Sequence, residues 1–145
     1  MYAENMFIAL HDQTDDIITF PYYVDKYDDF QGKSFPFDDS LLTCNCIIEG
    51  TPVLFNKKEL IEYLNGSSAG NKEIKSKGTL AEYWLGSPLM AGENKIGAIV
   101  VQSYEKEHLI TNDDRDLLGF VSDLLAMMIE NKRLEAERLE YQINL

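Results

Sequence analysis

The sequence predicts an α+β domain with an antiparallel central sheet, helices on both faces of that sheet, and a long C-terminal helix. Two observations lead to this fold class. Residues 79–90 and 95–104 are apolar runs on either side of a turn-forming Gly-Glu-Asn segment at 92–94, which is typical of an antiparallel hairpin. Residues 113–145 contain no proline and one glycine, Gly119, which favours a single long helix.

Local composition defines the elements before this hairpin. Two segments rich in β-branched and aromatic residues flank a polar turn, and Pro21 in the second marks an edge, a bulge or the end of regular pairing. Gly50 and Gly66 are placed to end two helices. In chain order, we expect strands at 5–12 and 17–25, a loop at 26–38, a helix at 39–49, a strand at 52–55, a helix at 57–64, a mobile loop at 65–78, strands at 79–90 and 95–104, and a helix from about 112 onward.

Two further features concern the end of the chain. The strand segment 98–101 is apolar on both faces, so we expect helices to cover both sides of the sheet. Thr111 is expected to cap the last helix, and Asp113 and Asp114 suit its positive end.

Bulk composition limits the class of protein. The 145 residues fit one domain, and the net charge of −12 argues against binding to nucleic acid or to an anionic membrane surface. The longest aliphatic run, 96–101, is far shorter than the roughly 20 residues that cross a bilayer. The N-terminus lacks the basic region of a signal peptide, so we expect a cytoplasmic protein without direct membrane insertion.

Four segments, in this order and spacing, resemble GAF domains, which are small-molecule sensor modules of signalling proteins. They are 7–12, similar to the family's first strand; 20–25, similar to the second strand of a bacterial subgroup; 84–89, Trp-Leu-Gly-Ser-Pro-Leu against the family's Trp-Leu-Gly-Val-Pro-Leu; and 97–104, followed by Asp114 and Leu117-Leu118. Ser87 departs from the family's usual valine.

The resemblance implies a GAF-like (profilin/PAS-like) sheet, with a sensory domain at 1–130 and a signalling or coiled-coil helix extension at 131–145. The subgroup typically occurs in sensor histidine kinases and diguanylate cyclases, which implies a downstream effector domain in the same polypeptide. The helix that usually precedes the first strand is almost absent, so the chain resembles a piece of a longer protein.

The chain carries no recognisable catalytic motif, since Gly-x-Ser-x-Gly, His-Glu-x-x-His and Cys–His signatures are missing. Cys44 and Cys46 are two positions apart on a predicted helix and cannot jointly hold one metal ion. We expect no metal site and no certain cofactor. His11 and His108 are expected to be structural or surface residues.

Binding of an unidentified small molecule is the alternative to catalysis. The candidate ligand-binding residues offer aromatic walls with polar tips, and plain core is the favoured alternative for any single ring: Tyr22, Tyr23, Trp84, Ser87 and Gln102. Five lysines within residues 57–77 would suit an anionic ligand, and a solvated loop is the favoured alternative for them. Asn56-Lys57 is only a fragment of the signature of cyclic-nucleotide-binding relatives.

The last helix carries two apolar faces. One face is expected to pack on the domain's own sheet: Leu117, Leu118, Val121, Leu125 and Met128. The other repeats with heptad spacing and predicts a homodimer seam, with a frayed charged helix as the alternative: Phe120, Leu124, Met127, Asn131, Leu134, Arg138, Tyr141 and Leu145.

These features favour a non-catalytic GAF-type sensory or regulatory domain that binds a small molecule and dimerises to control a histidine kinase or diguanylate cyclase. A ligand-free structural dimerisation module is the alternative. A GAF-like methionine-sulfoxide reductase is a third possibility, which needs reactive cysteines near the pocket.

Overall fold

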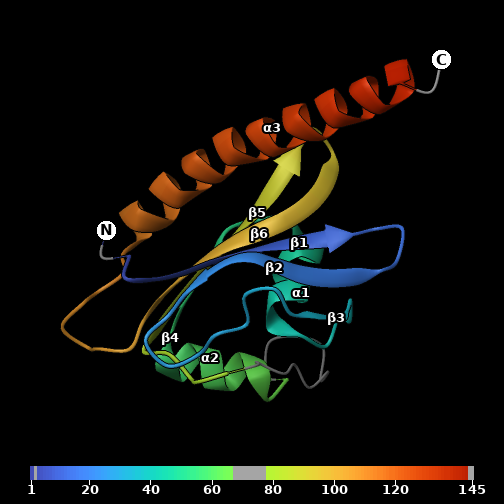
Figure 1. The fold of residues 1–145 in the computed structure, drawn as a ribbon. Helices are drawn as coiled ribbons and strands as arrows, with labels where there is room; N and C mark the ends of the chain where they lie inside the picture. The colour runs from blue at the N-terminus through green and yellow to red at the C-terminus, as the bar shows by residue number, and fades with distance from the viewer. Residues whose placement is uncertain (2, 67–77, 144–145) are drawn as a thin grey trace.

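Six strands form one antiparallel sheet in the order β3-β2-β1-β6-β5-β4 (Figure 1). The structure, a computed structural model, describes residues 1, 3–66 and 78–143. The elements are β1 (Asn5–Asp12), β2 (Ile17–Val24), β3 (Ser34–Pro36), α1 (Leu42–Glu49), β4 (Val53–Asn56), α2 (Lys57–Leu64), β5 (Tyr83–Ala91), β6 (Asn94–Ser103) and α3 (Asn112–Ile143). The predicted fold class is confirmed.

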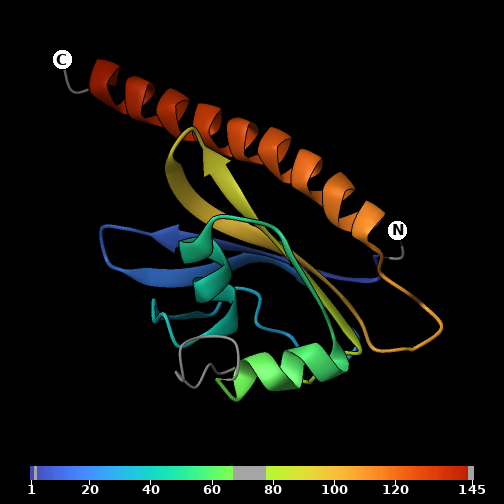
Figure 2. The same cartoon turned by 180° about the vertical axis from the view of Figure 1, so that it is seen from behind.

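Helices cover both faces of the sheet, as the apolar strands predict. Figures 1 and 2 show α3 across one face and α1 and α2 on the other. Neighbouring residues of β5 divide between the two sides, since Trp84 belongs to the buried cluster under α1 and Leu85 to the cluster under α3. Val100 and Val101 divide in the same way on β6. The sheet therefore has two separate apolar cores.

A bulge in the first hairpin decides which aromatic side chains share a face. Ile8 pairs with Tyr22, but Leu10 pairs with Thr19, so β2 has one extra residue around Pro21. Of the three alternatives expected from Pro21, the structure shows the bulge. Because the alternation is interrupted there, Phe20 and Tyr23 lie on the same face of the sheet.

The predicted helix ends and the main turn are also confirmed. Gly50 follows α1 with a φ of 74°, in the left-handed region that glycine adopts without strain. Thr111 and Asp114 exchange side-chain-to-backbone hydrogen bonds at the start of α3, at 3.3 and 2.9 Å. The main hairpin turns between Ala91 and Asn94.

The structure departs from the expected elements in three places. The predicted loop 26–38 contains β3, whose three residues pair with β2 and are too few to show a periodic pattern. Helix α1 begins at Leu42 and not at 39, because Asp38 accepts hydrogen bonds from the backbone of Ser40 and Leu41 in a turn. The fifth strand begins at Tyr83 and not at 79. Most of the predicted mobile loop 65–78 lies outside the described residues.

The face of α3 that packs on the sheet agrees with the predicted one only at Leu118 and Leu125. Leu118, Ser122 and Ala126 are buried, and Leu125 and Ile129 are partly buried beside them. The expected contacts Leu117, Val121 and Met128 are instead exposed. The small side chains of Ser122 and Ala126 let the helix approach the sheet closely, which turns the larger side chains on either side outward.

The second half of α3 leaves the domain. Residues 131–143 are exposed throughout, and Figure 1 shows this part of the helix extending past the sheet. No helix in the described ranges combines the length and the apolar character needed to cross a membrane.

Candidate functional site

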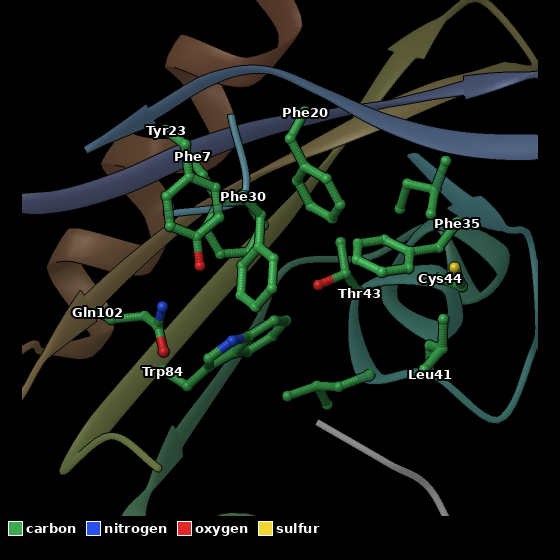
Figure 3. Close-up of a pocket in the computed structure, with 12 residues that line it drawn as sticks. Phe7, Phe20, Tyr23, Phe30, Phe35, Leu41, Thr43, Cys44, Trp84 and Gln102 are labelled. Carbon is green, nitrogen blue, oxygen red and sulfur yellow. The ribbon is translucent and has the colours of Figure 1, made fainter. Parts of the chain in front are cut away.

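An aromatic cavity lies between the sheet and α1 (Figure 3). Strands β1, β2, β3, β5 and β6, the loop between β2 and β3, and the start of α1 all contribute to its wall. The lining residues are Phe7, Ile18, Phe20, Tyr23, Phe30, Phe35, Leu41, Leu42, Thr43, Cys44, Trp84 and Gln102. Lysine and arginine are absent from this list, as are aspartate and glutamate, so the described wall is uncharged.

The rings fill most of the space that they enclose. Phe7 and Tyr23 stack at 4.8 Å between centroids, and Phe30 meets Tyr23 edge-on at 5.5 Å. The free volume is about 40 Å³, which is room for roughly three water molecules. Pockets for drug-sized ligands measure about 300–1,000 Å³. A larger ligand can enter only if a wall residue moves.

Three polar side chains gather on one side of the cavity, as Figure 3 shows: the Tyr23 hydroxyl, the Gln102 amide and the Trp84 indole. The Thr43 hydroxyl lies on the opposite side. Gln102 Nε2 donates to Asp25 Oδ2 at 3.4 Å, and the Tyr104 hydroxyl donates to the same oxygen at 2.8 Å. Asp25 thus holds the Gln102 amide in place by a hydrogen bond.

The Tyr23 phenol stays neutral in this setting. Burial raises its pKa well above the ordinary tyrosine value, and the negative charges of Asp25, Asp28 and Asp29 raise it further. Tyr23 is therefore a hydrogen-bonding group at physiological pH and carries no charge.

Three of the five predicted ligand-binding residues line this cavity: Tyr23, Trp84 and Gln102. Tyr22 lies outside it, since it pairs with Ile8 on the α3 face of the sheet and is exposed. Ser87 also lies outside, fully buried, with its Oγ 2.7 Å from Ser122 Oγ on α3. The position that departs from the family motif thus contacts the long helix.

Sequence reasoning missed most of the aromatic wall. Phe7 and Phe20 could have been found by continuing the alternation of β1 and β2 from Tyr23 across the bulge at Pro21. Phe30 and Phe35 come from the segment 26–38, which has no periodic pattern and gave no signal.

The two cysteines lie in α1 and are both buried. Cys44 lines the cavity, and burial is the main cause that raises the pKa of its thiol. Burial, followed by the charge of Glu49, raises the pKa of Cys46 to about 12. Both are therefore neutral thiols near pH 7, which makes them weak nucleophiles. Among the described residues, no group of three or more His, Cys, Asp or Glu side chains could hold a metal ion.

The predicted basic region does not face the aromatic cavity in the part that the structure describes. Lys57 and Lys58 line a separate open groove, together with Glu62 and Glu82. Asn56 has a structural role, since its side chain caps α2 in a reciprocal bond with Glu59. The lysines at 72, 75 and 77 lie outside the described residues.

The predicted dimer residues form no part of the domain's own core. Phe120, Leu124, Met127, Leu134 and Tyr141 are between 49% and 69% exposed. Asn131 and Arg138, at the intervening positions, are exposed as well, and Leu145 lies outside the described residues.

Comparisons with known proteins agree with this architecture. Residues 2–130 match the family model described as GAF domain. No curated protein matches the sequence. Among solved structures, the GAF domain of a phosphoenolpyruvate-protein phosphotransferase from Coxiella burnetii gives a TM-score of 0.70 at 14% identity, covering 93% of this chain and 76% of that one.

Two other similar structures come from different kinds of protein. The GAF domain of a two-component sensor histidine kinase from Bacillus halodurans has a TM-score of 0.68 at 13% identity, covering 94% and 87% of the two chains. A free methionine-R-sulfoxide reductase from Neisseria meningitidis has a TM-score of 0.66 at 16% identity, covering 92% and 71%. At these identities the likeness shows the fold alone. The family match spans most of the sequence, and the chain belongs to the GAF domain family.

Proposed function

We propose that this GAF domain is a non-catalytic sensory or regulatory module of a cytoplasmic signalling protein. It binds a small molecule in the aromatic cavity, dimerises through α3, and controls a histidine kinase or diguanylate cyclase domain in the same polypeptide. Similar structures that come from a sensor histidine kinase and a methyl-accepting chemotaxis protein support a signalling role.

The observation that carries the proposal is the position of the cavity relative to α3. Trp84 lines the cavity from β5, and three residues further along the same strand Ser87 touches α3. One strand thus joins the candidate ligand site to the helix that leaves the domain. A displacement of Trp84 by a ligand can therefore be passed along β5 to Ser87 and from there to α3.

A ligand-free structural dimerisation module is the second candidate, and the free volume of about 40 Å³ favours it. The two candidates differ in what the purified protein retains. Native mass spectrometry of freshly purified protein should show a bound small molecule if the domain is a sensor. A clean apo mass, followed by no change in melting temperature across a metabolite library, would favour the structural module.

The reductase alternative gains one observation, because Cys44 lines the cavity. Its raised pKa works against it, since the reaction needs a thiolate. Cys46 lies two positions along the same helix, where it faces a different direction. We therefore expect no thiol-dependent reduction of free methionine sulfoxide, and turnover that is lost in Cys44→Ser would overturn the non-catalytic proposal.

The dimer is tested by a matched pair of variants on the projecting part of α3. Leu134 lies in the predicted seam, whereas Leu139 lies outside the heptad, and the two are 49% and 51% exposed. Analytical ultracentrifugation should show a dimer for the wild type and for Leu139→Asp, and a folded monomer for Leu134→Asp. A wild type that is monomeric at high micromolar concentration would refute the seam, as would a dimeric Leu134→Asp variant.

A further inference from the structure

Two polar groups that face the cavity have no hydrogen-bond partner among the described residues. Tyr23 is 6% exposed and Trp84 is 3% exposed, and both line the cavity. Neither the Tyr23 hydroxyl nor Trp84 Nε1 takes part in a hydrogen bond within this part of the chain. Phenol and indole groups of buried rings usually find a partner. No fully buried side-chain nitrogen or oxygen among the described residues lacks one, so solvent still reaches these two groups from the cavity. The arrangement leaves room for a partner supplied from outside.

The third polar group, Gln102, adds an acceptor next to these donors. The carboxylate of Asp25 can only accept, so the amide must turn Nε2 toward it, and this fixes the orientation of Gln102. Its carbonyl oxygen and the second N–H of Nε2 are then left for the cavity. Figure 3 shows this amide beside the Tyr23 hydroxyl and the Trp84 indole.

We propose that the cavity selects a small, planar, uncharged molecule with an amide-type edge, such as a carboxamide or a lactam. The carbonyl oxygen of such a ligand accepts from Trp84 Nε1 and the Tyr23 hydroxyl, while its N–H donates to the carbonyl oxygen of Gln102. The phenyl rings of the wall stack on its plane. This inference rests on the proposed sensory function and narrows the class of ligand.

The charges around the cavity argue against an anion. No basic side chain lies in the described wall, and burying a carboxylate or phosphate without a cationic partner is costly. Asp25 lies directly behind Gln102 and adds repulsion. The anionic ligand that the lysine-rich segment suggested is therefore disfavoured at this site. An ammonium group cannot accept from Trp84 Nε1, which only donates, so it would leave that donor without a partner and is a poorer match as well.

Phe30 is the wall residue that we expect to move when a ring enters. It is half-buried, comes from the loop between β2 and β3, and meets Phe20, Tyr23 and Phe35 at centroid distances of 5.5–6.3 Å. A ligand ring that replaced the Phe30 ring would keep these aromatic contacts. Phe30→Ala should therefore open the cavity and strengthen binding of a ring-containing ligand.

The test compares three probes of similar size: benzamide, benzoate and benzylammonium. Isothermal titration calorimetry and ligand-observed NMR on wild type and Phe30→Ala should show benzamide binding at least about tenfold more tightly than either charged probe. Tyr23→Phe should weaken benzamide about three- to tenfold, because one hydrogen bond is lost while the ring remains. Tyr22→Phe, a neighbouring change on the other face of the sheet, should leave the affinity unchanged.

The outcomes separate this inference from the broader function. If benzoate or benzylammonium binds as well as benzamide, or if Tyr23→Phe matches Tyr22→Phe, the proposed ligand class is wrong and the sensory role stands. If none of the three probes binds to either protein, the sensory role loses its support together with this inference, and the structural dimerisation module is favoured.

Discussion

The hydrogen bond between Ser87 and Ser122 offers a quantitative test of how the sheet holds α3. Both hydroxyls are buried, at 0% and 1% exposure, and their oxygens are 2.7 Å apart. Ser122 Oγ also donates to the carbonyl oxygen of Gly119 at 2.8 Å. Since Ser122 uses its proton for Gly119, Ser87 must be the donor between the two serines.

Single substitutions at the two positions should differ in their effect. Ser122→Ala leaves the Ser87 hydroxyl buried without its partner and should lower the free energy of unfolding by about 1–3 kcal/mol. Ser87→Ala leaves Ser122 bonded to Gly119, so we expect a loss of about 1 kcal/mol. The double alanine variant removes both hydroxyls and should lose about 1 kcal/mol, less than the sum of the single losses.

Urea unfolding followed by Trp84 fluorescence, with circular dichroism as a second probe, measures these differences. Trp84 is the only tryptophan and is buried, so its emission reports on the core directly. A control cycle pairs Ser122→Ala with Ser34→Ala on the distant edge strand and should be additive within about 0.5 kcal/mol. Additivity of the same quality in the Ser87–Ser122 cycle would show that this hydrogen bond does not hold the helix.

Four further predictions follow from packing and ionisation. Gly97→Ala should cost about 3 kcal/mol or more, or prevent folding, because an added Cβ would lie 2.1 Å from the carbonyl oxygen of Ala9; thermal unfolding measures this. Burial and Glu49 raise the pKa of Tyr63 to about 12, above the value of about 10 for an unfolded tyrosine. Stability should therefore fall as the pH rises from about 10 to about 12, and this contribution should be absent in Tyr63→Phe. Cys46, whose pKa is raised to about 12, should not react with a thiol reagent at pH 8 until the protein unfolds. Asn56→Ala should lose about 1 kcal/mol in urea unfolding, since it removes the cap of α2.

The long apolar elements could be predicted because their patterns span several residues. Strands β5 and β6 are apolar on both faces, and the glycine at 92 marks the turn between them. The element β3 could not be predicted, since three residues carry no period and its pairing with β2 is a tertiary contact. Propensity alone cannot supply a contact of that kind.

The residues of the candidate site could be predicted from the sequence only in part, for a similar reason. Alternation places Trp84 and Gln102 on one face, and the register that pairs them directly is consistent with that pattern. Tyr22 and Tyr23 looked equivalent in the sequence, and only the bulge at Pro21 decides which of them faces the cavity. The orientation of α3 depended on two small residues, Ser122 and Ala126, which a count of apolar positions overlooks.

The first part of α3 is fixed on the sheet, and the second part projects beyond it, so a small tilt of the helix moves its far end. Ala126 is its last fully buried residue, and Ile143 lies seventeen residues beyond it. At 1.5 Å per residue, the helix from Ala126 to Ile143 is about 26 Å long. A tilt of about 5° at Ala126 would displace the end of the helix by about 2 Å, a distance comparable with the helix shifts that switch interfaces in other proteins. A movement too small to disturb the core can therefore change which side chains meet at the far end.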